Sequence, residues 1–315
     1  DKPLILIMDE FDALAEDAIS GIAGVLRNIY VHRQDDPSPS REKKYLLHGV
    51  ALIGVRSVLG IENVKGFPFN VQRGVHIPEL TFNEVEGMFQ WYEKESGRGV
   101  APDVVERVYH ETSGQPGLVS WLGELLTEGF DDYTPDQDKP AAMDDFEEVY
   151  AAAINVLPNN SILNIISKAK QEPYRHMVLE MFQTRKKIEF KFDDSDINFL
   201  YMNGAVDKEK TGKKGQYLKF SCPFVQKRLF NYFSHDLFKY MGTLHEPFED
   251  LSDSITETGL NIPNLMKRHQ EHLKKNRAWL LKDAPRRSDL KLYEAVYHFN
   301  LYMFLQEFSQ SFKGR

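Results

Sequence analysis

The pattern of apolar residues at the start of the chain predicts two strands separated by a helix. Residues Leu4 to Met8 are a continuous apolar run, which is typical of a strand buried on both faces of a parallel sheet. A second buried strand is predicted from Leu46 to Val55, after a polar loop over residues 33–44. The helix between them has its apolar residues near Ile19, Ile22, Val25, Leu26 and Ile29. The order strand, crossover helix, strand predicts a three-layer α/β core within residues 1–80.

The apolar spacing becomes helical from Thr81 to about Leu126. One predicted helical face carries Val85, Met88, Phe89 and Tyr92, so we expect a small helical bundle. Residues 128–148 then hold nine Asp or Glu against the single basic Lys139, which is typical of a solvated linker or the exposed start of a helix. We therefore group residues 81–150 as a helical region with an acidic linker.

Residues 155–242 show the element order of a winged helix. Two helical stretches lead to a strictly alternating run from Ile188 to Phe192, and a short helix over residues 196–203 is closed by Gly204 in a left-handed cap. Residues 205–209 and 216–220 then flank a glycine-containing tip and predict a hairpin, and Pro223 starts a further helix. Residues 245–290 are predicted as a helical linker broken near Pro263 and Pro285.

Two carboxylates follow the first predicted strand. An Asp at the carboxyl end of a buried strand can hold a Mg²⁺-bound water beside nucleotide phosphates, so Asp9 is a candidate magnesium residue. The adjacent Glu10 can polarise the attacking water and is a candidate catalytic residue. The alternative is structural: Asp9 caps the next helix and Glu10 complements its dipole.

Two other positions are candidates for the same site. Arg56 and Ser57 end the second predicted strand, where either could touch a γ-phosphate, although Arg56 could also be the first exposed residue after the strand. In the turn 112–118, Ser113 or Gly114 ends one helix and Pro116 starts the next, so unpaired amides there could face a nucleotide. A plain helix–helix connection is the alternative.

The order of these features resembles AAA-like and STAND-type P-loop ATPases. The run Leu4 to Glu10 looks like a Walker B strand, Val50 to Ser57 like a sensor-1 strand, and residues 67–81 like the strand leading into the lid. Gly114 to Gly117 is similar to the Gly-x-Pro of that lid, and a winged helix follows. The resemblance covers residues 1 to about 240. It implies the C-terminal part of a P-loop NTPase core with a helical lid, a winged-helix domain and a helical tail.

The resemblance implies ATP and Mg²⁺ as cofactors. By position, Asp9 is similar to the Mg²⁺-associated aspartate, Glu10 to the catalytic glutamate, Arg56 to the sensor-1 residue and Pro116 to the lid proline near the base. One departure is large, because residues 1–315 contain no Gly-x-x-x-x-Gly-Lys-[Ser/Thr], the loop that cradles phosphates. We therefore expect a fragment of a longer ATPase that hydrolyses nothing alone.

The tail, residues 291–315, predicts the start of a further domain. Leu292 to Leu301 resembles the opening helix of a PD-(D/E)XK nuclease, which would place Glu294 near a metal-binding core; a buried amphipathic helix is the alternative. The first functional hypothesis is thus an ATP-driven switch that gates an attached effector, such as a nuclease. The alternative is a winged-helix nucleic-acid-binding or regulatory protein without ATPase activity, and a third is an interaction scaffold.

The composition and charge of the chain limit the classes of partner that we expect. The net charge of −8 with a pI near 5.7 requires neither nucleic acid nor an anionic membrane, so any DNA contact must be local. The hairpin 207–219, with five lysines against two acids, and residues 267–291 are candidate DNA surfaces, with a solvated surface as the alternative.

His269 and His272 lack a metal-ligand pattern and predict a solvated helix. A single cysteine, Cys222, and no apolar run of roughly 20 residues predict a cytoplasmic protein without a membrane partner. The oligomeric state is left open.

Overall fold

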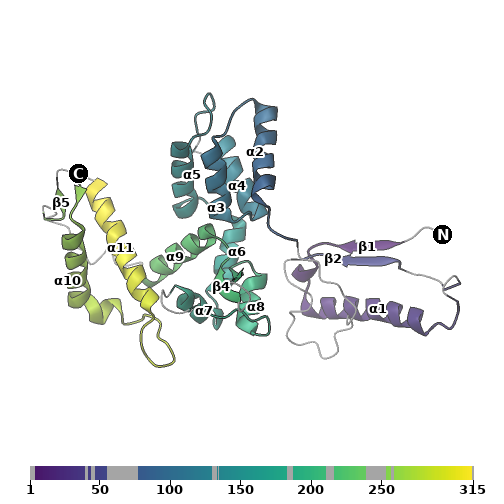
Figure 1. Ribbon diagram of the computed structural model, residues 1–315. Helices are drawn as coiled ribbons and strands as arrows, with labels where there is room; N and C mark the ends of the chain where they lie inside the picture. Colours follow the sequence, from purple (N-terminus) through teal and green to yellow (C-terminus); the bar gives the residue numbers. More distant parts are fainter. Residues whose placement is uncertain are drawn as a thin grey trace. The chain divides into compact units, whose positions relative to one another are not determined.

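The computed structural model describes residues 4–39, 42–43, 47–54, 77–129, 133, 135–182, 187–210, 216–238, 253–256 and 259–313. Within these residues the fold is mostly helical, with eleven α-helices and three two-stranded sheets (Figure 1). The expected P-loop core is not evident in the described ranges, so the fold is correctly predicted only in its coarse mixture of helices and small sheets. The chain forms two compact units. The strand unit is Asp1–Pro78 with Asp193–Asn203, and the helical unit is Glu79–Phe192 with Gly204–Arg315.

The strand unit contains a short parallel strand pair. Strand β1 (Ile5–Met8) pairs with β2 (Gly49–Leu52) in a register that sets Ile5 opposite Gly49 and Met8 opposite Leu52. The backbone ladder continues past the strands, since the Ile53 amide donates to Met8 O at 2.8 Å. Parallel pairing across an intervening helix confirms the predicted strand, helix, strand order. β2 is shorter than predicted, and residues 46 and 55 lie outside the described residues.

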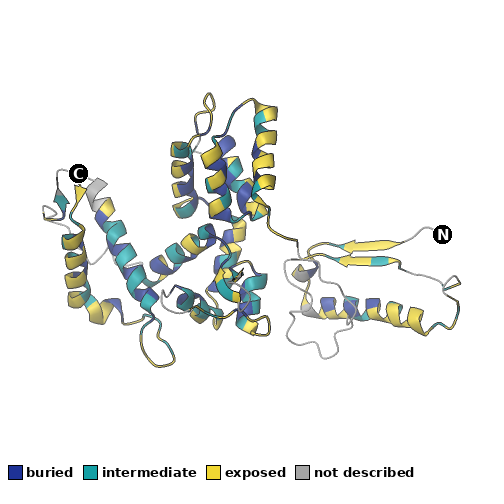
Figure 2. Cartoon of the chain, viewed as in Figure 1, coloured by how far each residue is buried: buried dark blue, intermediate teal, exposed yellow. Residues whose placement is uncertain are grey.

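The predicted burial of the first strand is wrong. The side chains of Ile5 and Ile7 are 63% and 65% exposed, and Figure 2 shows both strands mostly in the exposed colour. The physical reason is that the described part of this unit brings two strands to the sheet, which are too few to build a sheet enclosed by helices on both faces. Leu4 is also exposed, so the pair presents apolar side chains to solvent.

The remaining elements of the strand unit are the 3₁₀ helix η1 (Phe11–Ala13), α1 (Glu16–Asp35) and α8 (Ser195–Met202). α1 buries Ile19 and Leu26 as predicted, whereas Val25 is 59% exposed. Because α1 continues to Asp35, the polar loop begins later than predicted. α8 matches the short helix predicted over residues 196–203.

The first half of the helical unit contains α2 (Phe82–Ser96), α3 (Pro102–Thr112), α4 (Pro116–Thr127) and α5 (Met143–Asn155). These helices confirm the predicted bundle. Its fully buried side chains, with 0% exposed, include Val85, Val104, Val108, Leu122 and Leu126. α5 begins inside the acidic segment that was predicted as a linker or exposed helix start, and its first turn carries Asp144 and Asp145.

The next elements are α6 (Asn160–Ala169), α7 (Tyr174–Met181), β3 (Val206–Lys210), β4 (Gln216–Phe220) and α9 (Pro223–Phe238). β3 and β4 pair antiparallel and confirm the predicted hairpin, whose tip at 211–215 lies outside the described residues. The alternating run adds to the same sheet, since the Phe190 amide donates to Gln216 O at 2.9 Å and the Leu218 amide to Ile188 O at 2.8 Å. α9 starts at Pro223, as predicted.

The last part contains a small hairpin, β5 (Ile255–Thr256) with β6 (Gly259–Leu260), then α10 (Ile262–Leu280) and α11 (Glu294–Lys313). α11 packs on α9, where the ring centroids of Phe299 and Phe230 lie 4.9 Å apart. This contact shows that α11 is packed against the rest of the helical unit, and the nuclease resemblance stays a prediction. In the described residues no single helix has the length and apolar composition to cross a membrane, although α5 and α6, bent by 45°, pass that test as a pair.

Candidate functional site: two carboxylates after a parallel strand

Asp9 and Glu10 lie directly after β1 and are both exposed. The Glu10 amide donates to Asp9 Oδ1 at 2.9 Å, and Glu10 takes a left-handed backbone conformation with φ 50°. A glutamate in this conformation is uncommon and marks a sharp turn of the chain.

The capping alternative for these carboxylates is not what the structure shows. Glu10 is the N-cap residue of η1 but makes no side-chain cap hydrogen bond, and Ala15 caps α1. The Asp9 oxygen accepts from its neighbour's amide and not from a helix. A carboxylate has about four lone-pair sites, so this one bond leaves Asp9 able to accept a metal-bound water.

The carboxyl ends of β1 and β2 lie at one edge of the sheet. The Phe11 amide donates to Ile53 O at 2.9 Å, which places the residue after Glu10 beside the end of β2. Ligands of parallel α/β sheets bind at this edge. Arg56, the other predicted catalytic residue, lies outside the described residues. Pro116 belongs to the other unit, and among the described residues of the strand unit Asp9 and Glu10 are the predicted site residues that lie together.

The turn before Pro116 has the predicted construction. Ser113 and Gly114 are both left-handed, with φ of 51° and 78°, and α4 begins at Pro116. The side chain of Gln115 accepts from the Leu118 amide, and its main-chain oxygen accepts from the Val119 amide at 2.9 Å. These two helix amides are therefore already bonded, which weakens the argument that they hold an anion.

Gly114 fixes the entry of the chain into the helical unit. Its carbonyl oxygen accepts from the Leu80 amide at 2.8 Å. A Cβ at this position would lie 2.0 Å from the main-chain oxygen of Leu80, a clash that no rotamer change can relieve. Glycine is thus required both by the left-handed backbone and by this close approach.

A charge network around the buried Glu111, which sequence reasoning missed, joins α3, α5 and α9. The Glu111 side chain is 2% exposed, and Lys227 Nζ lies 3.2 and 3.0 Å from its two oxygens. The hydroxyl of Tyr150 donates to Glu111 Oε2, and Lys227 Nζ lies 3.1 Å from that hydroxyl oxygen. Arg107 adds a contact of 3.1 Å between its Nε and Glu111 Oε1. Three helices distant in sequence therefore share one carboxylate.

The pKa values of the network follow from its packing. Burial alone would raise the pKa of Glu111, but the hydrogen bonds from Tyr150 and Lys227, with the charges of Lys227 and Arg107, outweigh it and hold that pKa below its usual value. Burial and the Glu111 carboxylate raise the pKa of Tyr150. Glu111 is thus ionised and Tyr150 neutral near neutral pH.

One signal could have located Glu111. Val104, Val108, Glu111 and Thr112 share one helical face by their spacing, so the carboxylate falls on the apolar stripe of α3. A charged residue at such a position needs buried partners. Lys227 is 116 residues from Glu111 and 77 residues from Tyr150 along the chain. No local sequence pattern therefore identifies these partners.

The prediction that His269 and His272 lie on a solvated face is wrong. They are 8% and 9% exposed, and their rings lie 5.1 and 5.5 Å from that of Phe304. His269 Nε2 lies 2.9 Å from Asn300 Oδ1, and burial lowers the pKa of His269. These histidines therefore hold α10 against α11, because the apolar face of α10 includes them.

Metal-ligating clusters and reactive thiols are not found in the described part of the chain. No group of three or more His, Cys, Asp or Glu side chains there could hold a metal ion. Cys222 is a buried free cysteine, and burial raises the pKa of its thiol to about 11. That thiol is therefore protonated and unreactive near neutral pH.

Comparison with known proteins identifies no family for this chain: a scan against models of protein families, a search of curated proteins and a search of solved structures each found no match.

Proposed function

We propose that this chain is part of an ATP-binding and hydrolysing molecular switch of the AAA-like class, which gates an attached effector. The observation that carries the proposal is the position of Asp9 and Glu10 at the carboxyl end of a parallel strand, beside the end of β2. In this role Asp9 holds a Mg²⁺-bound water and Glu10 polarises the water that attacks the γ-phosphate. Arg56 and Pro116 are assigned to the same nucleotide as sensor and lid residues.

The exposure of β1 supports a larger sheet. Parallel sheets normally have both faces covered, whereas Leu4, Ile5 and Ile7 are 57%, 63% and 65% exposed. These side chains suit a position inside a three-layer core to which further strands and helices contribute. The proposal requires a phosphate-binding loop in the same protein, since residues 1–315 contain none.

The buried network supports the switch part of the proposal. In the proposed architecture α2–α4 form the lid, and the winged helix predicted over residues 155–242 includes the hairpin and α9. Glu111 on α3 and Lys227 on α9 then connect the lid with the winged helix through an ion pair in which the carboxylate is buried and the lysine is 45% exposed. A lid that responds to nucleotide would carry α9 with it, because separating the two removes Lys227 from the buried Glu111 carboxylate.

Nucleic-acid binding through the hairpin is the alternative, and its described lysines do not favour it. Lys219 pairs with Asp207 at 3.6 Å, and Lys208 Nζ lies 4.9 Å from the centroid of the Phe192 ring, so both cations already have partners within the protein. Salt-sensitive DNA binding that weakens when Lys213 and Lys214 are neutralised would support this alternative.

Reading the codons upstream of Asp1 is the first test of the ATPase proposal. We expect a Gly-x-x-x-x-Gly-Lys-[Ser/Thr] loop there, and a complete gene without it would rule out hydrolysis. Reading beyond Arg315 for an Asp followed by Glu-x-Lys tests the nuclease in the same way.

Turnover of MgATP by the full protein tests the residues. Glu10→Gln should lower the turnover rate by at least about 100-fold, because it removes the group that polarises water, while the affinity for a fluorescent ATP analogue stays unchanged. Glu42→Gln, an exposed glutamate of the same unit, is the matched control and should leave turnover unchanged. Unchanged turnover in Glu10→Gln would refute its role.

A further inference from the structure

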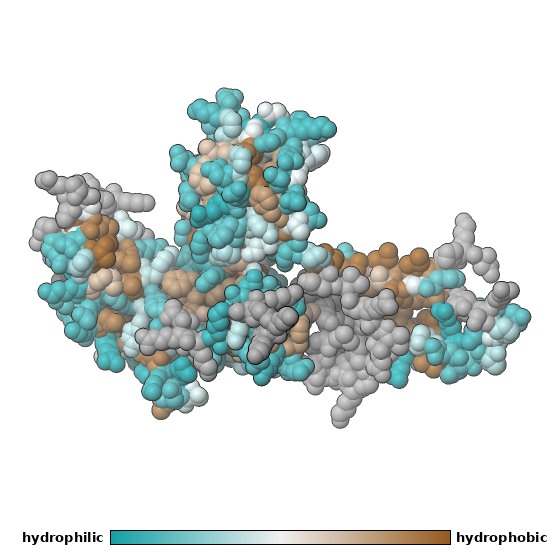
Figure 3. All heavy atoms as spheres, in the orientation of Figure 1, coloured by the Kyte–Doolittle hydropathy of each residue, from teal (hydrophilic) through white to brown (hydrophobic). Residues whose placement is uncertain are grey.

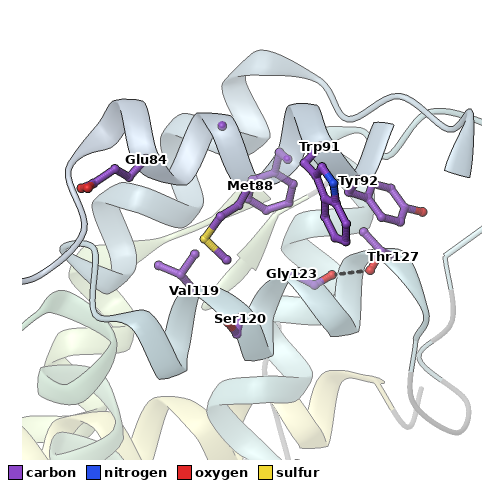
Figure 4. A pocket seen from close by; sticks show the side chains of 10 residues that line it. Glu84, Met88, Trp91, Tyr92, Val119, Ser120, Gly123 and Thr127 are labelled. Atoms are coloured by element: carbon purple, nitrogen blue, oxygen red, sulfur yellow. Dashed lines mark hydrogen bonds between the residues drawn. The ribbon is translucent and has the colours of Figure 1, made fainter. Parts of the chain in front are cut away.

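An apolar groove lies between α2 and α4 in the helical unit. Its volume is 520 Å³, and Met88 and Trp91 form one wall from α2 (Figure 4). Ser120, Gly123 and Thr127 of α4 lie opposite them. In the space-filling view a hydrophobic strip runs through the otherwise mostly hydrophilic surface of this bundle (Figure 3).

Small residues create the groove. A Cβ added at Gly87 would meet nothing within 4 Å, and one at Gly123 would touch only Phe89, at 3.8 Å. Both glycines are within helices, where alanine would be more stable by roughly 0.5–1 kcal/mol. The two glycines therefore leave space between α2 and α4 and lower the stability of both helices.

The wall of the groove has the composition of an interaction surface. Trp91 is 68% exposed and Met88 39% exposed, although both are large apolar side chains. Tryptophan is enriched among the residues that dominate binding energy, and methionine adapts to different partner shapes.

The helices beside the groove are strongly acidic. The exposed Glu95 is four positions after Trp91 on α2, and the exposed Glu124 is four positions after Ser120 on α4, so both lie close to the groove. The only basic residue in 82–96 and 116–128 is Lys94. The acidic residues of these two segments are Glu84, Glu86, Glu93, Glu95, Glu124 and Glu128.

We propose that this groove binds a basic amphipathic helix of a partner protein. One apolar side chain of that helix fills the space over Gly87 between Met88 and Trp91, and its lysines or arginines face Glu95 and Glu124. Helices lay an apolar face into a groove in this way, and opposite charges at the rim set orientation and association rate. The proposal goes beyond the ATPase hypothesis and does not depend on it, because it concerns only α2 and α4.

The test is titration of the 315-residue chain with a fluorescent 18-residue synthetic helix that has a leucine stripe and lysines elsewhere. Fluorescence anisotropy gives the affinity. Gly87→Leu, which fills the groove, should weaken binding by at least about 10-fold. Gly21→Leu is the matched control, because Gly21 also has open space around it and lies on the exposed side of α1. It should leave the affinity unchanged.

A second set of variants keeps the test independent of folding defects. Trp91→Gln changes an exposed side chain and should also weaken binding about 10-fold, with an unchanged circular dichroism spectrum. Glu95→Gln with Glu124→Gln should weaken binding and reduce its dependence on salt. Peptides with glutamate in place of lysine, or with glutamine in place of leucine, should not bind.

Three results would overturn the proposal. Gly87→Leu could bind the basic helix as well as the native chain, which would place binding outside the groove. The glutamate peptide could bind equally well, which would remove the charge argument. Sedimentation could show a dimer that Gly87→Leu dissociates, in which case a second copy of the chain occupies the groove.

Discussion

The strand pair of the strand unit and helix α4 of the helical unit differ in how far their apolar side chains are buried. In the strand unit, Ile5 and Ile7 of β1 are more than half exposed. In the helical unit, Leu122 and Leu126 of α4 are fully buried among neighbouring helices. The helical unit therefore encloses a core of its own. The strand pair has the apolar residues of a core strand, but in the described residues no further layers cover it.

The first prediction compares two identical truncations in the two units. Leu122→Ala should lower the free energy of unfolding by about 4 kcal/mol, because it leaves a cavity in a packed core. Leu4→Ala, at a side chain that is 57% exposed, should change it by less than about 0.5 kcal/mol. Urea denaturation followed by circular dichroism measures both. Equal losses would contradict the comparison.

The second prediction concerns the turn that leads into α4. Gly114→Ala should cost about 3 kcal/mol, because the added Cβ would meet the Leu80 main-chain oxygen and the left-handed backbone disfavours alanine. Gly87→Ala is the control, in open space within α2, and should stabilise the chain by up to about 1 kcal/mol. Thermal unfolding distinguishes them, and a neutral Gly114→Ala would show that the turn can move.

The third prediction compares the lysine that pairs with the buried Glu111 with another exposed lysine. Lys227→Met should lower the free energy of unfolding by about 2 kcal/mol, because Glu111 keeps Tyr150 and Arg107 but loses its closest cation. Lys275→Met, at an exposed position of α10, should change it by less than about 0.5 kcal/mol. A stable Lys227→Met variant would show that α3 and α9 do not depend on this pair.

The smallest predicted effect is a dependence on pH. Because the folded-state pKa of Glu111 lies below the ordinary glutamate value, its contribution to stability is complete above the ordinary value and is lost as the pH falls through the folded-state pKa. Glu111→Gln should remove this part of the acid dependence. Denaturation curves collected over the acid range test it, and an unchanged dependence in Glu111→Gln would assign it to other carboxylates.

Local sequence patterns predicted the elements better than their environment. Apolar spacing located α2, α3 and α4, and the turn residues Gly114, Pro116 and Gly204 marked the ends of helices, because these signals act within a few residues. The burial of β1 was not predictable from its own four residues, because it depends on which layers cover the sheet.

For the candidate site too, local patterns located individual residues but not contacts between distant parts of the chain. Asp9 and Glu10 were located by a local pattern, and their position beside the end of β2 follows from parallel pairing. The network of Glu111, Tyr150 and Lys227 was missed because its members meet only when three helices pack. The nucleotide role of Asp9 and Glu10 stays a prediction.

Hydrogen exchange of the backbone amides tests the central comparison most directly. The account predicts that amides of Leu118 to Leu126 in α4 are protected at least about 100-fold more than those of Ile5 to Met8 in β1, because only α4 lies in an enclosed core. Equal protection of the two segments in the 315-residue chain would contradict the account, since it would show that the strand pair is as securely folded as the helical unit.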